Sequence, residues 1–385
     1  MLAPTPFFAD RGCHVRIYEE ARALVQAGHE VQIITYHLGR DMPGLVTHRT
    51  AFLPWYSKLE AGPSWHKPYI DILLFFKALS AAQKFKPDLI HAHLHEGAFI
   101  GIFLKQILGI PLLFDCQGSL CGEMIDHGFM VKGSVLARFF GWIEAFINRS
   151  VDRIITSSTP AADDILNRST LSEQFVTPVT DGVNTDDFCP MDKVSARQEL
   201  AIPENTPVAA FLGLFNHYQG LDILFEAILI LKDRGLTVHF LLMGFPDEKY
   251  REMAKSMGIE AMITFTGKVD YSKAAKLLSA ADLALSPKIS LTEANGKLFN
   301  YMACALPSLV FDTPVNREIL GDCGFYATFG SSLDYADKIE ALLSDSALCK
   351  KVGDISRQKA LKEHSWSSRV DKLIEVYADL PGRRS

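Results

Sequence analysis

Residues 211–227 read FLGLFNHYQGLDILFEA: an apolar run meets Gly213, and a helical pattern begins after Gln219 and Gly220. The order strand, glycine, turn, helix is how many α/β proteins build a phosphate site, because the N–H groups at a helix N-terminus attract anions. No arginine or lysine stands between the two glycines. The stretch therefore predicts an α/β fold and leaves open which residues would balance the charge of a phosphate.

Short apolar runs alternate with longer helical patterns along most of the chain. The runs cover residues 31–35, 88–93, 111–116, 153–158, 175–179, 208–213, 238–244, 263–267, 283–287 and 308–312. Runs with so few alternating polar positions are typical of parallel strands covered on both faces. Two successive series of strands and helices predict an α/β protein with two doubly wound, Rossmann-like domains.

The turn-rich segment DGVNTDDFCP at residues 181–190 marks the expected domain junction, after an N-terminal domain of residues 1–180. The start of that domain is unusual, because only Met1–Ala3 precede Pro4 where a first strand is expected. Either that strand is very short or the chain begins upstream, and we favour the second explanation.

Composition narrows the class of protein. The 385 residues are 48% hydrophobic and 22% charged with a net charge of −6, which is globular and gives no basic field for nucleic acid. Seven scattered cysteines without a C-x-x-C motif are typical of a reduced, cytoplasmic chain. The apolar stretches are shorter than the roughly 20 residues of a spanning helix. We expect a soluble protein that at most lies on a membrane surface.

The segment LSPKISLTEANGKLFNYMACALPSLVFD at residues 285–312 has the chemistry of an anion site. Gly296 and Lys297 open a short helix, and Lys288 and Lys297 bracket the polar loop before it, so helix N–H groups and two cations could meet a phosphate. Side chains of the kind that bind sugar hydroxyls also occur here, namely Glu293, Asn295 and Asn300. The alternative is a surface loop with solvated charges.

Several of these segments carry a family resemblance. They are YMACALPSLVFD, FLGLFNHYQGLDIL, DGVNTDDFCP, ADRGCHVRIYEEARALVQAGHEVQIIT, DLIHAHLHEG and VDRIITSS. Together they resemble the retaining, group 1 glycosyltransferases of GT-B fold across almost the whole chain. The resemblance implies a donor domain at 181–364, a last helix at 365–385 that completes the N-terminal domain, and an active site in the cleft between the domains. It also implies a nucleotide-diphosphate sugar as donor substrate.

Four positions depart from the family pattern. The diphosphate-binding arginine and lysine of the family are replaced by Leu214 and Gln219, a ribose-binding carboxylate by Asn300, and an active-site histidine by Gln117. One explanation is a noncatalytic relative that binds a nucleotide sugar or a partner without turnover. The other is a subgroup that moved its cations to other positions. We favour the second, because the glycines are kept and the replacements can still form hydrogen bonds.

The resemblance and the residue chemistry together predict the site. The catalytic candidates are Lys288 and Lys297 on the leaving diphosphate and Gln117 with Asp115 at the reacting carbon. The donor-binding candidates are Gly213, Gln219, Glu293, Asn295, Gly296 and Asn300. Arg11, Gly12 and His93 are expected at the rim of the cleft. We expect no cofactor and no metal, since His91, His93 and His95 alternate along a strand end without the spacing of a helical metal motif.

The predicted reaction transfers a sugar to an acceptor hydroxyl of a glycan or lipid in cell-envelope synthesis. A GT-B enzyme of another reaction, such as a sugar-nucleotide epimerase, is a weaker alternative. Residues 135–153 suggest a further partner, because apolar side chains in helical register stand among Lys132, Arg138, Arg149 and Arg153. Such a helix could rest on an anionic membrane or simply pack on its sheet.

Overall fold

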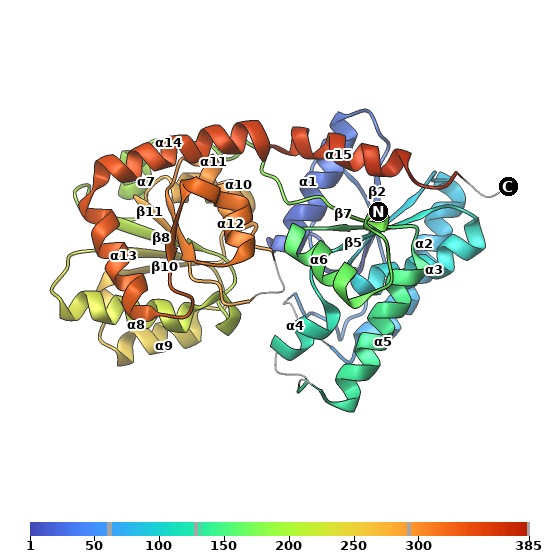
Figure 1. The fold of residues 1–385 in the computed structure, drawn as a ribbon, viewed down its shortest axis with the longest axis horizontal. Helices are drawn as coiled ribbons and strands as arrows, with labels where there is room; N and C mark the ends of the chain where they lie inside the picture. The colour runs from blue at the N-terminus through green and yellow to red at the C-terminus, as the bar shows by residue number, and fades with distance from the viewer. Residues whose placement is uncertain (60–63, 127–129, 132, 291–293, 383–385) are drawn as a thin grey trace. The chain divides into compact units, whose positions relative to one another are not determined.

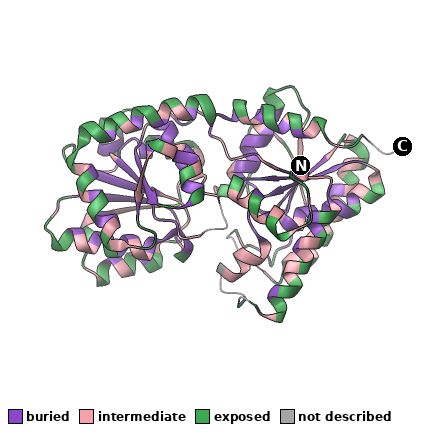
Figure 2. Ribbon diagram, viewed as in Figure 1, coloured by how far each residue is buried: buried purple, intermediate pink, exposed green. Residues whose placement is uncertain are grey.

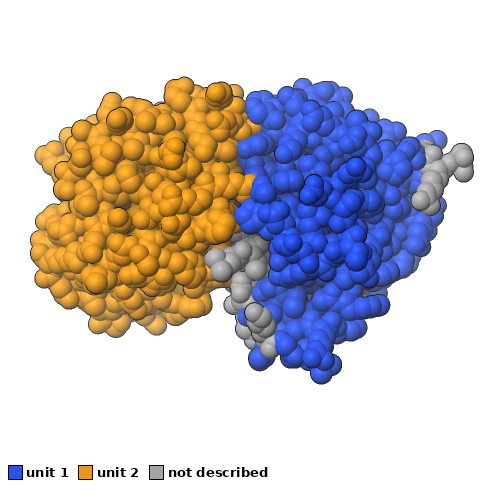
Figure 3. Space-filling view, in the orientation of Figure 1, with its two compact units in different colours: residues 1–181, 292–294, 366–385 blue, residues 182–291, 295–365 orange. Residues whose placement is uncertain are grey.

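The computed structural model describes residues 1–59, 64–126, 130–131, 133–290 and 294–382. The chain forms two compact units, coloured separately in Figure 3. Unit 1 contains Met1–Asp181 and the C-terminal segment from Trp366, and unit 2 contains Gly182–Leu291 and Asn295–Ser365. The division falls inside the turn-rich segment at residues 181–190.

Unit 1 is built on a seven-stranded parallel sheet in the order β3-β2-β1-β4-β5-β6-β7 (Figure 1). Its strands are β1 Leu2–Ala3, β2 Gln32–Thr35, β3 Val46–Arg49, β4 Ile90–His93, β5 Leu112–Cys116, β6 Arg153–Thr156 and β7 Val176–Pro178. Its helices are α1 Gly12–Gln26, α2 Lys67–Phe85, α3 Leu94–Leu108, α4 Leu120–Asp126, α5 Val135–Ser150, α6 Thr159–Arg168 and α15 Trp366–Ala378, with a short 3-10 helix, η1 Glu173–Phe175.

Unit 2 is built on a six-stranded parallel sheet in the order β10-β9-β8-β11-β12-β13. Its strands are β8 Val208–Leu212, β9 His239–Met243, β10 Ile263–Gly267, β11 Leu283–Ser286, β12 Ser308–Phe311 and β13 Gly324–Ala327. Its helices are α7 Lys193–Glu199, α8 Leu221–Asp233, α9 Glu248–Ser256, α10 Tyr271–Leu278, α11 Lys297–Ala303, α12 Pro314–Leu320, α13 Ser332–Ser344 and α14 Ser346–Glu363. Three further 3-10 helices are η2 His217–Gln219, η3 Glu260–Met262 and η4 Gly321–Cys323.

Each sheet of parallel strands is covered by helices and forms the centre of its unit. The strands are largely buried in Figure 2, and in unit 2 they separate two apolar cores, one on each face of the sheet. Alternate residues of β8 show this division, because Ala210 belongs to one core and Phe211 to the other. Two Rossmann-like domains confirm the predicted fold class.

The ends of the chain complete unit 1. β1 has only two residues, yet it pairs with both β2 and β4. At the other end, α15 packs against α1, and Trp366, Val370 and Leu373 share an apolar cluster with Leu24. No helix in the described part of the chain is long and apolar enough to cross a membrane.

Candidate functional site

Two loops of unit 2 meet at the carboxyl ends of the neighbouring strands β8 and β11. The loop after β8 passes through η2 to Gly220, which has a φ of 72° and opens α8. A β-carbon on Gly220 would lie 1.8 Å from the carbonyl oxygen of Pro287, which follows β11. The N–H of Ile289 donates to the carbonyl of Tyr218 at 2.9 Å. Glycine at this position therefore allows the two loops to form one surface.

Lys297 brings a positive charge to that surface. Its ammonium contacts the side-chain oxygen of Gln219 and lies 4.3 Å from the centroid of the Phe211 ring. The same nitrogen would be 3.1 Å from a β-carbon placed on Gly213. Lys297, at the start of α11, thus lies close to both Gln219 and Gly213 of the loop after β8. The cation lies beside the glycine where the family pattern expects a basic neighbour.

Lys288 faces the same loop from the end of β11. Its side chain is 5% exposed, and its ammonium lies 6.0 Å from the centroid of the Tyr218 ring. A buried ammonium is costly unless polar groups or an anion balance it. The second predicted cation therefore also lies against the residues between Gly213 and Gly220.

Asn295 was expected to bind the donor sugar, but its contacts lie inside unit 2. It is buried, its side-chain oxygen accepts from the Ser286 hydroxyl at 3.1 Å, and its amide nitrogen donates to Asn316 at 2.9 Å. Both ends of the amide are used inside unit 2, so Asn295 fixes the loop instead of contacting a sugar. Gly296 has helical dihedrals just before α11, and Asn300 is half-buried within that helix. Glu293 lies outside the described residues.

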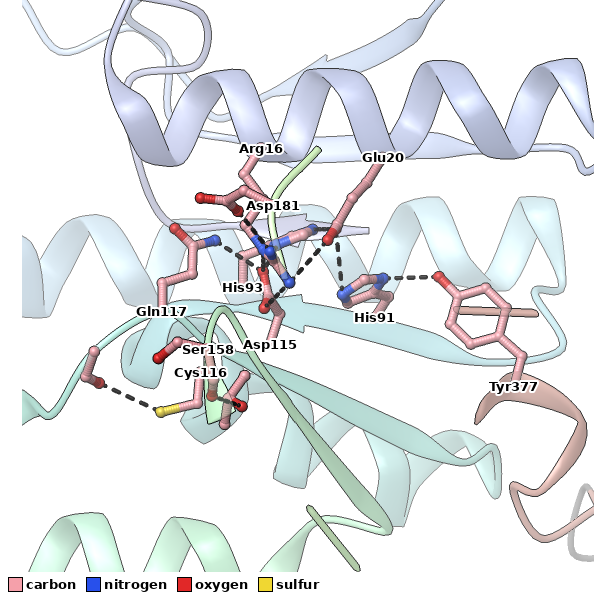
Figure 4. A network of polar contacts seen from close by, with 12 residues as sticks. Arg16, Glu20, His91, His93, Asp115, Cys116, Gln117, Ser158, Asp181 and Tyr377 are labelled. Atoms are coloured by element: carbon pink, nitrogen blue, oxygen red, sulfur yellow. Dashed lines mark hydrogen bonds and ion pairs between the residues drawn. The ribbon is translucent and has the colours of Figure 1, made fainter. Parts of the chain in front are cut away.

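Asp115 is the centre of a buried polar network in unit 1 (Figure 4). Arg16 holds both of its oxygens, with Nε and Nη2 each at 2.9 Å. His93 Nδ1 and the Gln117 amide nitrogen each lie 2.9 Å from Asp115 Oδ2. Arg16 Nη1 also donates to Asp181 at 2.6 Å. Charged hydrogen bonds of this kind are among the strongest in proteins.

These contacts keep the Asp115 carboxyl ionised and engage both of its oxygens. Burial alone would raise the pKa of its carboxyl, but the charge of Arg16 and hydrogen bonds from His93 and Arg16 hold that pKa well below its usual range. The carboxylate has no exposed surface left for a substrate. The catalytic role of Asp115 stays a prediction. In this structure its carboxylate accepts a hydrogen bond from the amide nitrogen of the half-buried Gln117.

His93 was expected at the rim of the cleft, but its side chain is fully buried in this structure. Its ring stacks on that of His91 with centroids 4.3 Å apart, and His91 Nδ1 lies 2.8 Å from the Tyr377 hydroxyl of α15. His95 belongs to α3 and packs edge-on to Phe114, so the three histidines do not share a face.

Four ligand-type residues of this network could suggest a metal. Glu20, His91, His93 and Asp115 offer atoms within 4.8 Å of one another. However, Arg16 already supplies a cation there, since its Nη2 also lies 3.1 Å from Glu20. The Nε2 atoms of the two stacked rings lie 3.8 and 3.9 Å from one Glu20 oxygen, which is too far for hydrogen bonds. The arrangement fits an ion-pair network better than a metal centre.

Sequence reasoning missed Arg16, Glu20 and Asp181. The available signal was Arg16 and Glu20 one helical turn apart in the first helix, on the side that packs inward. Arg11 precedes that helix and donates to the Leu59 carbonyl at 3.1 Å. A β-carbon on Gly12 would have no atom within 4 Å. The backbone at Gly12 is therefore open to a ligand.

Both domains of the chain match known glycosyltransferase families. Residues 11–178 match the glycosyl transferase 4-like domain, and residues 192–359 match the glycosyl transferases group 1 model. A D-inositol 3-phosphate glycosyltransferase from Thermobispora bispora is 24% identical over 397 residues, covering 96% of this chain and 90% of the relative. An enzyme of the same description from Corynebacterium aurimucosum is 24% identical, covering 76% and 72%.

Solved structures show the same fold. Sucrose-phosphate synthase from Thermosynechococcus elongatus superposes with a TM-score of 0.82 at 19% identity, covering 98% of this chain and 97% of that one. Anabaena Alr3699/HepE, solved with UDP and glucose, gives 0.80 at 16% identity, covering 98% and 99%. The two domains and their loops thus define a GT-B nucleotide-sugar glycosyltransferase. The chain is a glycosyltransferase, and residues 192–359 match the group 1 model.

Proposed function

We propose that the protein transfers a sugar from a nucleotide diphosphate to a hydroxyl of a glycan or lipid-linked acceptor, with retention of the anomeric configuration. The observation that carries the proposal is the contact of Lys297 with Gln219 beside Gly213. A cation beside a glycine backbone would suit a bound diphosphate, and this supports the proposal. We assign the reaction to the cytoplasm and to cell-envelope synthesis, by analogy with the family.

The chemistry follows from charge. When the bond between sugar and diphosphate breaks, negative charge grows on the leaving phosphate and positive charge on the sugar. Fixed cations aimed at the leaving group stabilise that transition state more than the ground state. Lys297 and Lys288 would supply this effect, and Gln219 would hold Lys297 in place until the donor arrives. The proposal needs no metal at this step.

Gln117 would help to position the acceptor. Its amide nitrogen is bound to Asp115, so the amide oxygen remains to accept a hydrogen bond from a hydroxyl. Neither a glutamine nor the fully occupied Asp115 can act as a general base. A reaction with retention does not require a base opposite the leaving group, and this supports the proposed stereochemistry. Proton NMR of the initially formed glycoside would give its anomeric configuration. An inverted configuration would contradict the proposed retention.

Nucleotide binding tests the donor site directly. We would measure thermal unfolding with UDP, GDP, ADP and their sugar conjugates, starting with UDP because Anabaena Alr3699/HepE was solved with it. A nucleotide at 100 times its dissociation constant should stabilise the fold by about 2.7 kcal/mol. Lys297→Ala should abolish the shift. Lys276→Ala is the matched control, because that lysine is in the same unit but bridges Glu199 on the surface.

The outcomes test the proposed donor site. A selective shift that is lost in Lys297→Ala and kept in Lys276→Ala supports the donor site and identifies the base. No shift with any nucleotide in a folded protein contradicts that site. It would favour a relative without turnover.

A further inference from the structure

Three neighbouring helices of unit 1 present apolar side chains to solvent. α2 packs on α3, and α3 packs on α5, so the three form one layer over the sheet (Figure 1). Their outward side chains are 40–84% exposed. They are Ile72 and Phe76 of α2, Phe99, Phe103 and Ile107 of α3, and Val135, Leu136, Phe139, Trp142 and Phe146 of α5. We call this set the apolar face.

The apolar face is ordered along each helix. Apart from Val135 at the start of α5, its residues recur every three or four positions, so each helix contributes a stripe on the side away from the sheet. Phe139, Trp142 and Phe146 stack in sequence, with ring centroids 6.4 and 6.1 Å apart. The inward sides of the same helices fill the core through residues such as Leu74, Ile102 and Ile147. Packing on the sheet therefore does not explain the outward stripes. So many exposed apolar side chains on neighbouring helices are typical of an interaction surface.

Charge identifies the partner. The acidic residues of the three helices are all engaged within unit 1. Asp71 accepts from the Tyr36 hydroxyl at 2.5 Å, Glu96 pairs with Lys67 at 2.5 Å, and Glu144 accepts from the Ser119 hydroxyl at 3.2 Å. The basic side chains at the margins of the face include three that are exposed: Lys84, Arg138 and Arg149. On a chain of net charge −6, this surface combines apolar stripes with exposed cations on the same helices.

We propose that the apolar face rests on an anionic lipid bilayer, with the aromatic side chains in the interface and the cations at the headgroups. Apolar burial and attraction to anionic lipid add in this mode of binding, and tryptophan favours the interface. A second copy of the chain fits less well. A two-fold interface places the same patch against itself, so the cations of one copy would face a surface that also carries cations. This inference does not depend on the proposed donor site.

Vesicle flotation tests the surface. The full chain should bind vesicles containing about one-third phosphatidylglycerol at least tenfold more strongly than pure phosphatidylcholine vesicles, and added salt should weaken the binding. F139S/W142S/F146S should lower binding to both kinds of vesicle by tenfold or more. R138Q/R149Q should remove mainly the preference for anionic lipid. Because these side chains point to solvent, circular dichroism and Tm should stay unchanged.

F329S/L333S is the matched control, since Phe329 and Leu333 are also exposed apolar residues but lie in unit 2. It should bind vesicles as the unchanged chain does. Light scattering on a sizing column shows whether the chain self-associates. The proposal is overturned if the folded chain binds neither kind of vesicle, or if the control loses as much binding as F139S/W142S/F146S. It is also overturned if the triple variant dissociates a dimer without changing vesicle binding.

Discussion

Gly220 and Pro287 approach so closely that a β-carbon on the glycine would lie 1.8 Å from the proline carbonyl oxygen. This contact joins the loop after β8 to the loop after β11. It places Gln219 within reach of Lys297 and Tyr218 near Lys288. The close packing of two backbones, rather than one side-chain bond, therefore defines the surface that we assign to the donor diphosphate.

Gly220→Ala should separate these loops. Gly235→Ala is a close control, because the two glycines have φ values of 72° and 74° but no atom lies within 4 Å of a β-carbon on Gly235. Left-handed dihedrals cost alanine about 1–2 kcal/mol at either position. Gly220→Ala should lose roughly 2 kcal/mol more, because overpacking adds to that strain. Chemical denaturation measures both losses, and equal losses would show that the contact with Pro287 is unimportant.

Substitutions of Gln219 should change stability and nucleotide binding in opposite directions. Gln219→Lys puts a second ammonium beside Lys297, so the unliganded protein should lose on the order of 1 kcal/mol from like-charge repulsion. A bound diphosphate relieves that repulsion, and the shift in Tm caused by nucleotide should grow. Gln219→Glu should do the reverse, because it neutralises Lys297 before the donor binds. Thermal unfolding with and without nucleotide measures both. Equal nucleotide shifts in the two variants would rule out a diphosphate at Lys297.

The fold was predictable from the sequence because each Rossmann-like unit repeats a strong local signal. The strand runs at 208–213 and 263–267 occur as β8 Val208–Leu212 and β10 Ile263–Gly267. β3 and β13 were missed, since each has only four residues and VTHR is mostly polar. Both are edge strands, which need less burial than central ones.

The site was only partly predictable, because burial and partners depend on tertiary packing. Lys297 and Gln219 come from loops that are distant in sequence but end neighbouring strands, and the strand order could suggest their meeting. Asp115 and His93 are more deeply buried than the sequence suggested, for one reason. Both stand at the ends of parallel strands, where ligands bind, but Arg16 of the adjacent helix fills that space and converts them into a buried network.

The Arg16–Asp115 pair should matter for stability far more than a similar pair on the surface. Asp115→Asn leaves the buried guanidinium of Arg16 without one of its carboxylates, which typically costs about 3–5 kcal/mol. Asp312→Asn is the control: Arg317 also grips Asp312 with two nitrogens, at 2.7 and 2.8 Å, but both residues are exposed. That variant should scarcely change the midpoint of urea unfolding. Similar midpoints for the two variants would argue against a tightly bound network in unit 1.

Gln117→Ala tests the role assigned to the other end of this network. The side chain is half-buried and donates to Asp115, so its loss should leave most of the folding free energy intact. If Gln117 positions the acceptor in the transition state, kcat should fall by roughly 10–100-fold while nucleotide affinity stays the same. Gln117→Asn, which shortens the amide, should recover little activity. Unchanged kcat in Gln117→Ala would remove Gln117 from the site.

Asp71 should make stability depend on pH. Burial raises the pKa of its carboxyl to about 7, although the hydrogen bond from Tyr36 opposes that shift. In the unfolded chain the pKa should be near 3.9. Between these values the folded protein holds a proton that the unfolded chain has lost, so the free energy of unfolding falls as pH rises. For one proton the slope is at most about 1.4 kcal/mol per pH unit.

Asp71→Asn removes this titration while keeping a group that can accept from Tyr36 at 2.5 Å. The neighbouring charges of Lys67 and Glu96 remain in the variant, so they cancel in the comparison. The free energy of unfolding of the variant relative to the unchanged chain should rise from about pH 4 to about pH 7 and then level off, because Asp71 is ionised in both states above that pH. Urea unfolding across this range measures the difference. Parallel curves would mean that Asp71 is already ionised in the folded protein at pH 5.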